Sequence, residues 1–278
     1  MLKVLRSFQW HRYVQSPRWA LAFAFGTSAF ILMYLLNGLV AEINPGNWWG
    51  LAYGTAASLL MLGAGFYAVR RRMLKRDLGK SEAWVQFHLY GGTLAGLLVL
   101  LHTGFRLPHG LFDWILWLLS IWVTLSGMLG VALQQWIPKI LSSGLSVEAM
   151  YERIPELVEQ IRARAEKMVE SWPEPVRDFY RSNIAAALIA PQPRLIYYID
   201  VTGGIQSSIK QFGFLRKVLS LEEKEKLDQL QDLYRTKLEL DAHYSLQRPL
   251  RLWLATHVPL SLVLLLMVAL HIWAVWYY

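Results

Sequence analysis

The sequence predicts an all-α integral membrane protein, a bundle of five transmembrane helices with a small, mostly helical insert between the fourth and the fifth. Two observations lead to this fold class. The 278 residues are 55% hydrophobic and only 17% charged, which is too apolar for an ordinary soluble domain. Five segments also meet or approach the roughly 20 apolar residues that a helix needs to cross a bilayer.

The apolar segments give the helices and the domain boundaries. Helices one to four and the N-terminal arm occupy residues 1–137, the insert occupies 138–249, and helix five occupies 250–278. The first apolar segment is too long for a signal-peptide core and its arm has no clear cleavage site, so it is expected to be retained. The five predicted spans are Arg18–Ala41, Trp49–Tyr67, Trp84–Phe105, Leu111–Trp136 and Leu250–Tyr277.

The placement of charge predicts the orientation. The N-terminal arm and residues 70–80 are strongly basic, whereas the loop at 42–48 has one acid and no base. The positive-inside rule then puts the N-terminus and the insert in the cytoplasm and the C-terminus outside an inner or plasma membrane. Because the net charge of +8 comes from residues that flank apolar segments, it indicates contact with lipid and argues against a nucleic-acid surface.

The insert is too long for a simple connector and reads as a small helical domain, because its apolar residues recur at helical spacing. Its 16 basic and 16 acidic residues cancel, so it adds nothing to the net charge. Ser220 and Glu223 match a capping box that would open its last helix. The expected elements are a helix over Ile154–Trp172, a shorter helix over Val176–Ile189, a strand or extended chain over Leu195–Val201, and a helix from Ser220 to His243.

Four histidines form two matched pairs inside the third and fifth spans. His88 and His102 are fourteen residues apart, and so are His257 and His271. Fourteen residues end about 40° short of four full helical turns, so each pair lies on one face of its helix, about 21 Å apart along the axis. Histidine inside a membrane is costly and usually functional. The repeated spacing therefore predicts two metal or haem sites rather than isolated polar contacts.

Topology and ligand number narrow this prediction. Helices three and five are separated by one helix, so they run parallel, and His88 must pair with His257 while His102 pairs with His271. The chain has no cysteine, which removes thiolate zinc sites, cysteine-ligated iron–sulfur clusters and covalent haem attachment. Two histidines are too few for a typical zinc site, but they suit the two axial positions of a haem iron. The sequence thus predicts two b-type haems.

Other residues are candidates for haem contacts. Gly91 and Gly92 follow His88 and would let a flat macrocycle approach the helix, although small residues also serve ordinary helix packing. Arg106, four residues past His102 and expected on the same helix face, is the basic residue predicted to meet the propionates on the outer side. The inner side offers too many arginines to choose among.

This pattern of His88, His102, His257 and His271 resembles the di-haem, four-histidine b-type membrane cytochromes. These include cytochrome b of respiratory bc complexes and the ferric reductase-like transmembrane family, in which two parallel helices separated by one other carry paired histidines at this spacing. The sequence departs from the ferric reductases by lacking a sixth helix and a flavin and nicotinamide domain. It departs from the bc cytochromes by lacking a Pro-Glu-Trp motif and by its helical insert.

The expected function is electron transfer across the membrane between a quinone pool and redox partner proteins, such as a cytochrome c or an iron–sulfur subunit of a membrane oxidoreductase complex. Asp241 and His243, just before helix five, are candidates for proton exchange with a quinone, although a polar helix end docked on the bundle explains them as well. Two alternatives stay open: a transmembrane ferric or oxygen reductase fed by a separate cytoplasmic donor, and a transporter whose histidines relay protons.

Overall fold

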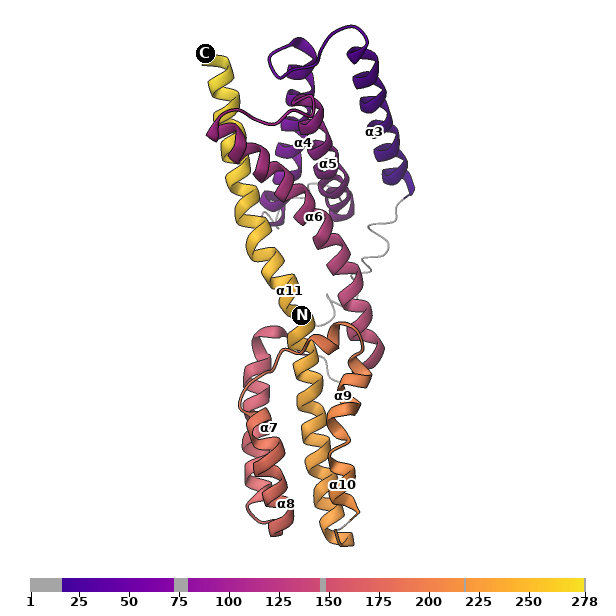
Figure 1. The fold of residues 1–278 in the computed structure, drawn as a ribbon, viewed down its shortest axis with the longest axis vertical. Coiled ribbons are helices and arrows are strands. Elements are labelled where there is room, and N and C mark those ends of the chain that lie inside the picture. Colours follow the sequence, from indigo (N-terminus) through magenta and orange to yellow (C-terminus); the bar gives the residue numbers. More distant parts are fainter. Residues whose placement is uncertain (1–16, 73–79, 146–148, 218, 278) are drawn as a thin grey trace. The chain divides into compact units, whose positions relative to one another are not determined.

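The computed structural model describes residues 17–72, 80–145, 149–217 and 219–277, and all regular structure within them is helical (Figure 1). Half of the basic residues behind the predicted orientation, those at 1–16 and 73–79, lie outside these ranges. The main helices are α3 (Pro17–Gly38), α4 (Trp48–Arg72), α5 (Ser81–His102), α6 (Leu111–Gly144), α7 (Ile154–Val169), α8 (Glu174–Phe179), α9 (Val201–Ile209), α10 (Phe212–Arg216) and α11 (Leu221–Tyr277).

Five helices within the described residues, α3, α4, α5, α6 and α11, are long and apolar enough to cross a membrane. The chain divides into two compact units. One comprises residues 1–135 and 253–278 and is called the membrane unit here; the other comprises residues 136–252 and is called the insert. Helix α11 contributes its first part to the insert and its last part to the membrane unit.

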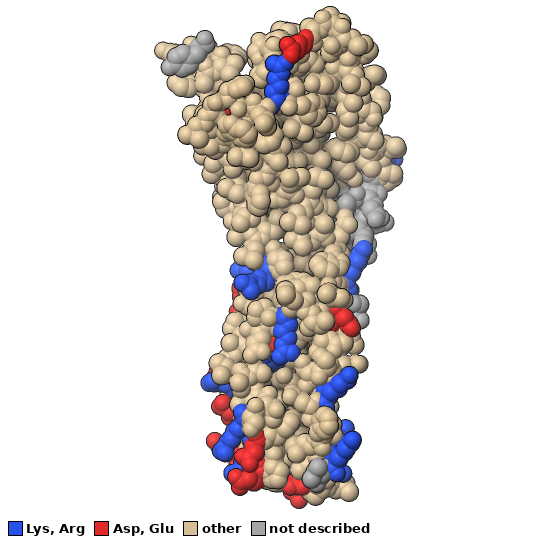
Figure 2. Space-filling model, viewed as in Figure 1, with Lys and Arg blue, Asp and Glu red and all other residues tan. Residues whose placement is uncertain are grey.

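The membrane unit has a small core where α4 meets α5 and α3. Tyr53, Leu98 and Leu101 are almost fully buried there, and the Tyr53 hydroxyl accepts a hydrogen bond from Asn37 at 3.0 Å. Many aliphatic side chains on the outside of these helices are exposed, and in the view of Figure 2 the surface of this unit is nearly free of charge. An apolar exterior around a partly polar interior is the arrangement expected in lipid.

Helix α5 ends earlier than the sequence predicts. Thr103 is its C-cap, and Gly104 then adopts a φ of +59°, where a Cβ would come within 2.5 Å of the Ile43 carbonyl oxygen. Only glycine fits this close turn without strain. The prediction that Arg106 continues the helix face of His102 is therefore wrong, because Arg106 lies in the loop that follows the helix.

Two helices instead run on where the sequence predicts a break. Helix α6 passes through Pro138 to Gly144, and α11 is one helix through Pro249, where a boundary between two helices was expected. Proline lacks the N–H that would bond the carbonyl four residues earlier. At Pro249 this carbonyl belongs to Ser245, and the Tyr198 hydroxyl donates to it at 2.6 Å. A tertiary contact thus supplies the hydrogen bond that the proline removes.

The insert is built around the first part of α11. Ile154 and Val158 of α7 pack with Leu240 on one side, while Phe212 of α10 contacts Tyr234 with ring centroids 5.8 Å apart; in Figure 1, α7 and α8 flank α11 opposite α9 and α10.

Within the insert, the predicted capping box is confirmed, whereas two predicted segments have a different structure. The Ser220 amide donates to the Glu223 carboxylate at 2.8 Å, and the Glu223 amide to the Ser220 hydroxyl at 3.5 Å, which confirms the capping box. The helix expected over Val176–Ile189 is divided into α8, a π-helical turn at Tyr180–Ile184 and a 3₁₀ turn at Ala185–Leu188. The segment expected to be extended contains the 3₁₀ helix η4 (Leu195–Tyr198).

Candidate functional site

The structure brings the four intramembrane histidines together as two pairs within the membrane unit. The ring centroids of His88 (α5) and His257 (α11) are 6.5 Å apart and their planes cross at 84°. The rings of His102 and His271 repeat this arrangement at 6.3 Å and 83°. Both pairs join the same two helices, α5 and α11, with nearly the same geometry.

These separations suit a metal ion held between two imidazoles. A metal binds an imidazole nitrogen at about 2.0–2.1 Å, and this nitrogen lies about 1.2 Å from the ring centre, so two imidazoles on opposite sides of one ion would have centroids about 6.4–6.6 Å apart. The observed values of 6.5 and 6.3 Å agree with this estimate. Near-perpendicular planes are compatible with it, because each ring can rotate about its bond to the metal.

Helix α4 fixes the orientation of the two α5 histidines. His88 Nδ1 lies 2.9 Å from the Ala64 carbonyl oxygen, and His102 Nδ1 lies 2.8 Å from the Gly50 carbonyl oxygen. Because a carbonyl oxygen only accepts, Nδ1 must carry the proton in both rings. Nε2 of each neutral ring then keeps its lone pair, which is the arrangement found in metal-ligating histidines.

The histidines of α11 differ from each other. His257 Nδ1 lies 2.9 Å from the Ser126 hydroxyl of α6, and this hydroxyl lies 3.2 Å from the Val123 carbonyl oxygen, to which it donates. Ser126 can therefore accept a hydrogen bond from the N–H at His257 Nδ1, which again leaves Nε2 as the ligand atom. His271 has no hydrogen bond to a described residue and stacks against Phe112 at 6.4 Å.

Small residues make room for the rings. A Cβ on Gly54 would lie 2.8 Å from His102 Nδ1, and one on Gly127 would lie 3.4 Å from His257 Cε1. The two predicted glycines differ: a Cβ on Gly91 would meet Phe87 and Leu60, whereas one on Gly92 would meet no protein atom within 4 Å. Gly92 is thus the one beside open space, and its contact with a macrocycle stays a prediction.

We expect Gly54→Ala to disrupt the His102 and His271 pair alone. The added methyl would overlap the His102 ring, which must then leave its hydrogen bond to Gly50. A matched control is Gly63→Ala on the same helix, whose Cβ would overlap Phe87 at a similar 2.7 Å without touching a histidine. If the two pairs bind haem as the sequence predicts, the haem content per chain after purification should fall by one in Gly54→Ala and stay unchanged in Gly63→Ala. Equal losses would point to general damage of helix packing.

The structure gives Arg106 a different partner from the predicted one. Its guanidinium forms an ion pair with Glu42 in the loop between α3 and α4, and both side chains are exposed. This pair joins two loops at the same end of the membrane unit. A haem propionate that contacted Arg106 would have to share its guanidinium with Glu42 or displace the Glu42 carboxylate.

Asp241 and His243 lie inside the insert. The Asp241 carboxylate is fully buried, forms an ion pair with Lys237 at 2.6 Å and accepts a hydrogen bond from the Gln192 amide at 2.9 Å. His243 is 5% exposed and its Nδ1 lies 3.3 Å from the Gln247 amide nitrogen. These contacts give Asp241 a structural role within the insert, where the sequence had left open a polar helix end docked on the bundle. A role in quinone chemistry stays a prediction.

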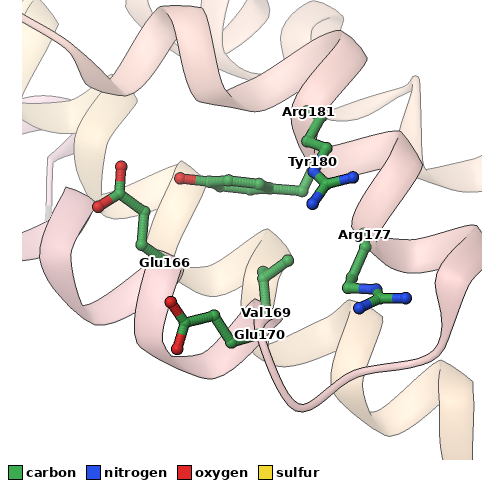
Figure 3. Close-up of a pocket in the computed structure, with 6 residues that line it drawn as sticks. All are labelled: Glu166, Val169, Glu170, Arg177, Tyr180 and Arg181. Atoms are coloured by element: carbon green, nitrogen blue, oxygen red, sulfur yellow. The ribbon is translucent and has the colours of Figure 1, made fainter.

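The insert also has a surface groove between α7 and the π-helical turn. Figure 3 shows the Tyr180 ring reaching across it from the arginine side toward Glu166. Arg177 pairs with Glu174 and Glu166 with Arg162, so much of its charge is balanced locally. The groove contains no predicted site residue.

Within the part of the chain that the structure describes, each histidine pair lacks further protein donors that could complete a metal site by themselves. Among described residues, no group of three or more histidine, cysteine, aspartate or glutamate side chains could hold a metal ion, so each pair supplies only two protein ligands. Comparison with protein-family models, curated proteins and solved structures finds no match. The chemistry of the site must therefore be argued from its own geometry.

The sequence missed one part of this site, the role of α4. Gly50 and Ala64, whose carbonyl groups meet the two α5 histidines, are themselves fourteen residues apart. Because every residue has a backbone carbonyl group, the residue types at these two positions carried no signal of this role.

Proposed function

We propose that this protein is a di-haem b-type cytochrome that carries electrons across the membrane between a quinone pool and redox partner proteins. The observation that carries the proposal is the two histidine pairs, each with ring centroids at a separation that would allow both imidazoles to bind one haem iron. Each histidine pair would supply two nitrogen ligands to an iron ion, and a porphyrin would supply the other four. In this proposal the N-terminus and the insert face the cytoplasm and the C-terminus faces outside.

The residues divide into ligands and groups that orient them. His88 and His257 would hold one haem, and His102 and His271 the other, each through Nε2. Three of the four histidines donate a hydrogen bond from Nδ1, to the carbonyl groups of Ala64 and Gly50 and to the hydroxyl of Ser126. Such hydrogen bonds make the imidazoles more basic as ligands and set the orientation of the rings. When bound, haem supplies reversible one-electron chemistry at the iron.

The protein packs closely around one of the four rings. His257 is 7% exposed, and Trp253 stacks on it with ring centroids 5.5 Å apart. The Trp253 indole in turn donates to the Ser126 carbonyl oxygen at 2.7 Å. Burial and hydrogen bonding are the means by which a protein adjusts the potential of such a centre.

The test is an optical redox titration of the purified full-length chain. We expect b-type bands on reduction, two haems per chain, and two one-electron steps. Reduction by a quinol analogue should support the quinone-linked role. A folded preparation that retains no haem, after expression with adequate haem supply, would contradict the proposal.

Ser126→Ala should change one haem selectively. The substitution removes the acceptor of the His257 Nδ1 proton, so the imidazole becomes less basic and stabilises ferric iron less. We expect a raised midpoint potential for that haem and about 10- to 100-fold weaker retention. The control is Ser120→Ala on the same helix, because Ser120 is also buried but donates only to the Leu116 carbonyl oxygen. An equal shift in both variants, or a shift of the other haem, would contradict the assignment.

A further inference from the structure

The 3₁₀ helix η4 carries an exposed aliphatic surface on the insert. Leu195 is 82% exposed, Ile199 88% and Ile196 44%. The neighbouring residue Tyr197 points the other way and is fully buried. Three large aliphatic side chains on one short segment form a patch that water would disfavour.

This aliphatic surface is held in place by the residues on either side of it. The Gln192 amide donates to Asp241 at 2.9 Å, the Arg194 amide to the Ser245 hydroxyl at 3.1 Å, and the Tyr198 hydroxyl to the Ser245 carbonyl oxygen at 2.6 Å. All three bonds end on α11. The exposed side chains are therefore presented from a fixed backbone.

The contacts of Tyr198 place η4 beside the ends of two apolar helices. Its ring stacks with Trp136 at 6.5 Å and 25°, and Trp136 lies near the end of the apolar part of α6, which runs from Leu111 to Leu141. Its hydroxyl bonds Ser245, just before the apolar run of α11 begins. Tryptophan and tyrosine at such ends mark the membrane interface.

The charges nearby also suit a lipid surface. Arg248 is exposed and acts electrostatically on the Tyr198 hydroxyl, while Lys139 is exposed on the last turns of α6. Basic residues next to an apolar segment favour anionic headgroups.

We propose that η4 is an interfacial membrane anchor, in which Leu195, Ile196 and Ile199 enter the headgroup–acyl boundary of the leaflet where α6 leaves and α11 enters the bilayer. Lipid is favoured as the occupant because the patch is continuous with two helix ends that themselves meet the lipid. The inference is independent of haem binding, since it rests on residues of the insert and on the apolar helices alone.

The absence of native cysteine allows a direct test by site-directed spin labelling. Leu195→Cys and Ile199→Cys would each be labelled with a nitroxide in the full-length chain, reconstituted in phosphatidylcholine–phosphatidylglycerol vesicles. Collision rates with oxygen, which concentrates in lipid, and with a water-soluble nickel chelate give the depth of the label. Glu170→Cys, exposed on the insert, serves as the aqueous control and Leu262→Cys, exposed on the apolar part of α11, as the lipid control.

We expect both η4 labels to favour oxygen over the nickel chelate several-fold more than the label at position 170, and to lie shallower than the label at position 262. Labels as accessible to the nickel chelate as position 170 would overturn the anchor. Labels shielded from both reagents would also overturn it, because they would indicate a protein contact. The exposed positions tolerate the label without disturbing the core, which the unchanged elution volume of each variant checks.

Discussion

His88→Ala and His257→Ala should each remove the same haem and leave the other in place. His102→Ala and His271→Ala should each remove the second haem. An alanine deletes the Nε2 that one side of the pair offers, so the pair keeps only one imidazole. Haem per chain should therefore fall from two to one in every single variant, and the remaining optical bands should distinguish the two classes.

The control for this series is His109→Ala. His109 is exposed in the loop between α5 and α6, so its loss should leave both haems. Free imidazole added to an alanine variant should restore the missing band if the ligand alone was lost, whereas a misfolded variant would not respond. If His88→Ala and His271→Ala removed the same haem, the pairing and the parallel arrangement of α5 and α11 would both be wrong.

The histidine pairs show what a single sequence can predict about this protein. The spacing of fourteen on two parallel helices is a direct consequence of helix geometry, so His88 beside His257 and His102 beside His271 could be anticipated without any relative. The spans followed from apolar length, and all five are present among the described helices.

What the sequence could not supply are contacts made by the backbone or across long distances in the chain. The Ala64 and Gly50 carbonyl groups that orient the histidines exist in every residue type, so no side-chain pattern reports them. The continuity of α11 through Pro249 was missed for a related reason. Local propensity favours a break there, and the compensating hydroxyl of Tyr198 comes from 51 residues earlier in the chain.

The buried ion pair in the insert is the site of the largest expected stability effect. Lys237 and Asp241 are both 0% exposed; burial lowers the pKa of Lys237 and raises the pKa of Asp241, because both charged forms lose their hydration. Removing one partner leaves the other charge uncompensated, which costs about 3–5 kcal/mol. We expect Lys237→Met to lower the free energy of unfolding of the insert by this amount, measured by a protease pulse across a urea series.

The matched control is Lys226→Met in the same helix. Lys226 pairs with Glu222 at 2.8 Å and with the same spacing of four, but Glu222 is 79% exposed, so the cost should stay below about 1 kcal/mol. A loss in Lys237→Met no larger than this would show that the buried pair contributes little.

The double variant Lys237→Met/Asp241→Asn separates stability from chemistry at Asp241. Asparagine keeps an acceptor for the Gln192 amide and removes the second charge, so the double variant should be more stable than Lys237→Met alone. A double variant as unstable as the single one would contradict this account of the pair.

The same double variant tests the role of Asp241 in quinone chemistry. If the insert of this variant is stable and quinol still reduces both haems at the wild-type rate, the role of Asp241 is to hold the chain at 192–198 on α11, and it takes no part in proton exchange. If the insert is stable but quinol reduction is lost, the carboxylate itself is needed, because the scaffold around it is then intact.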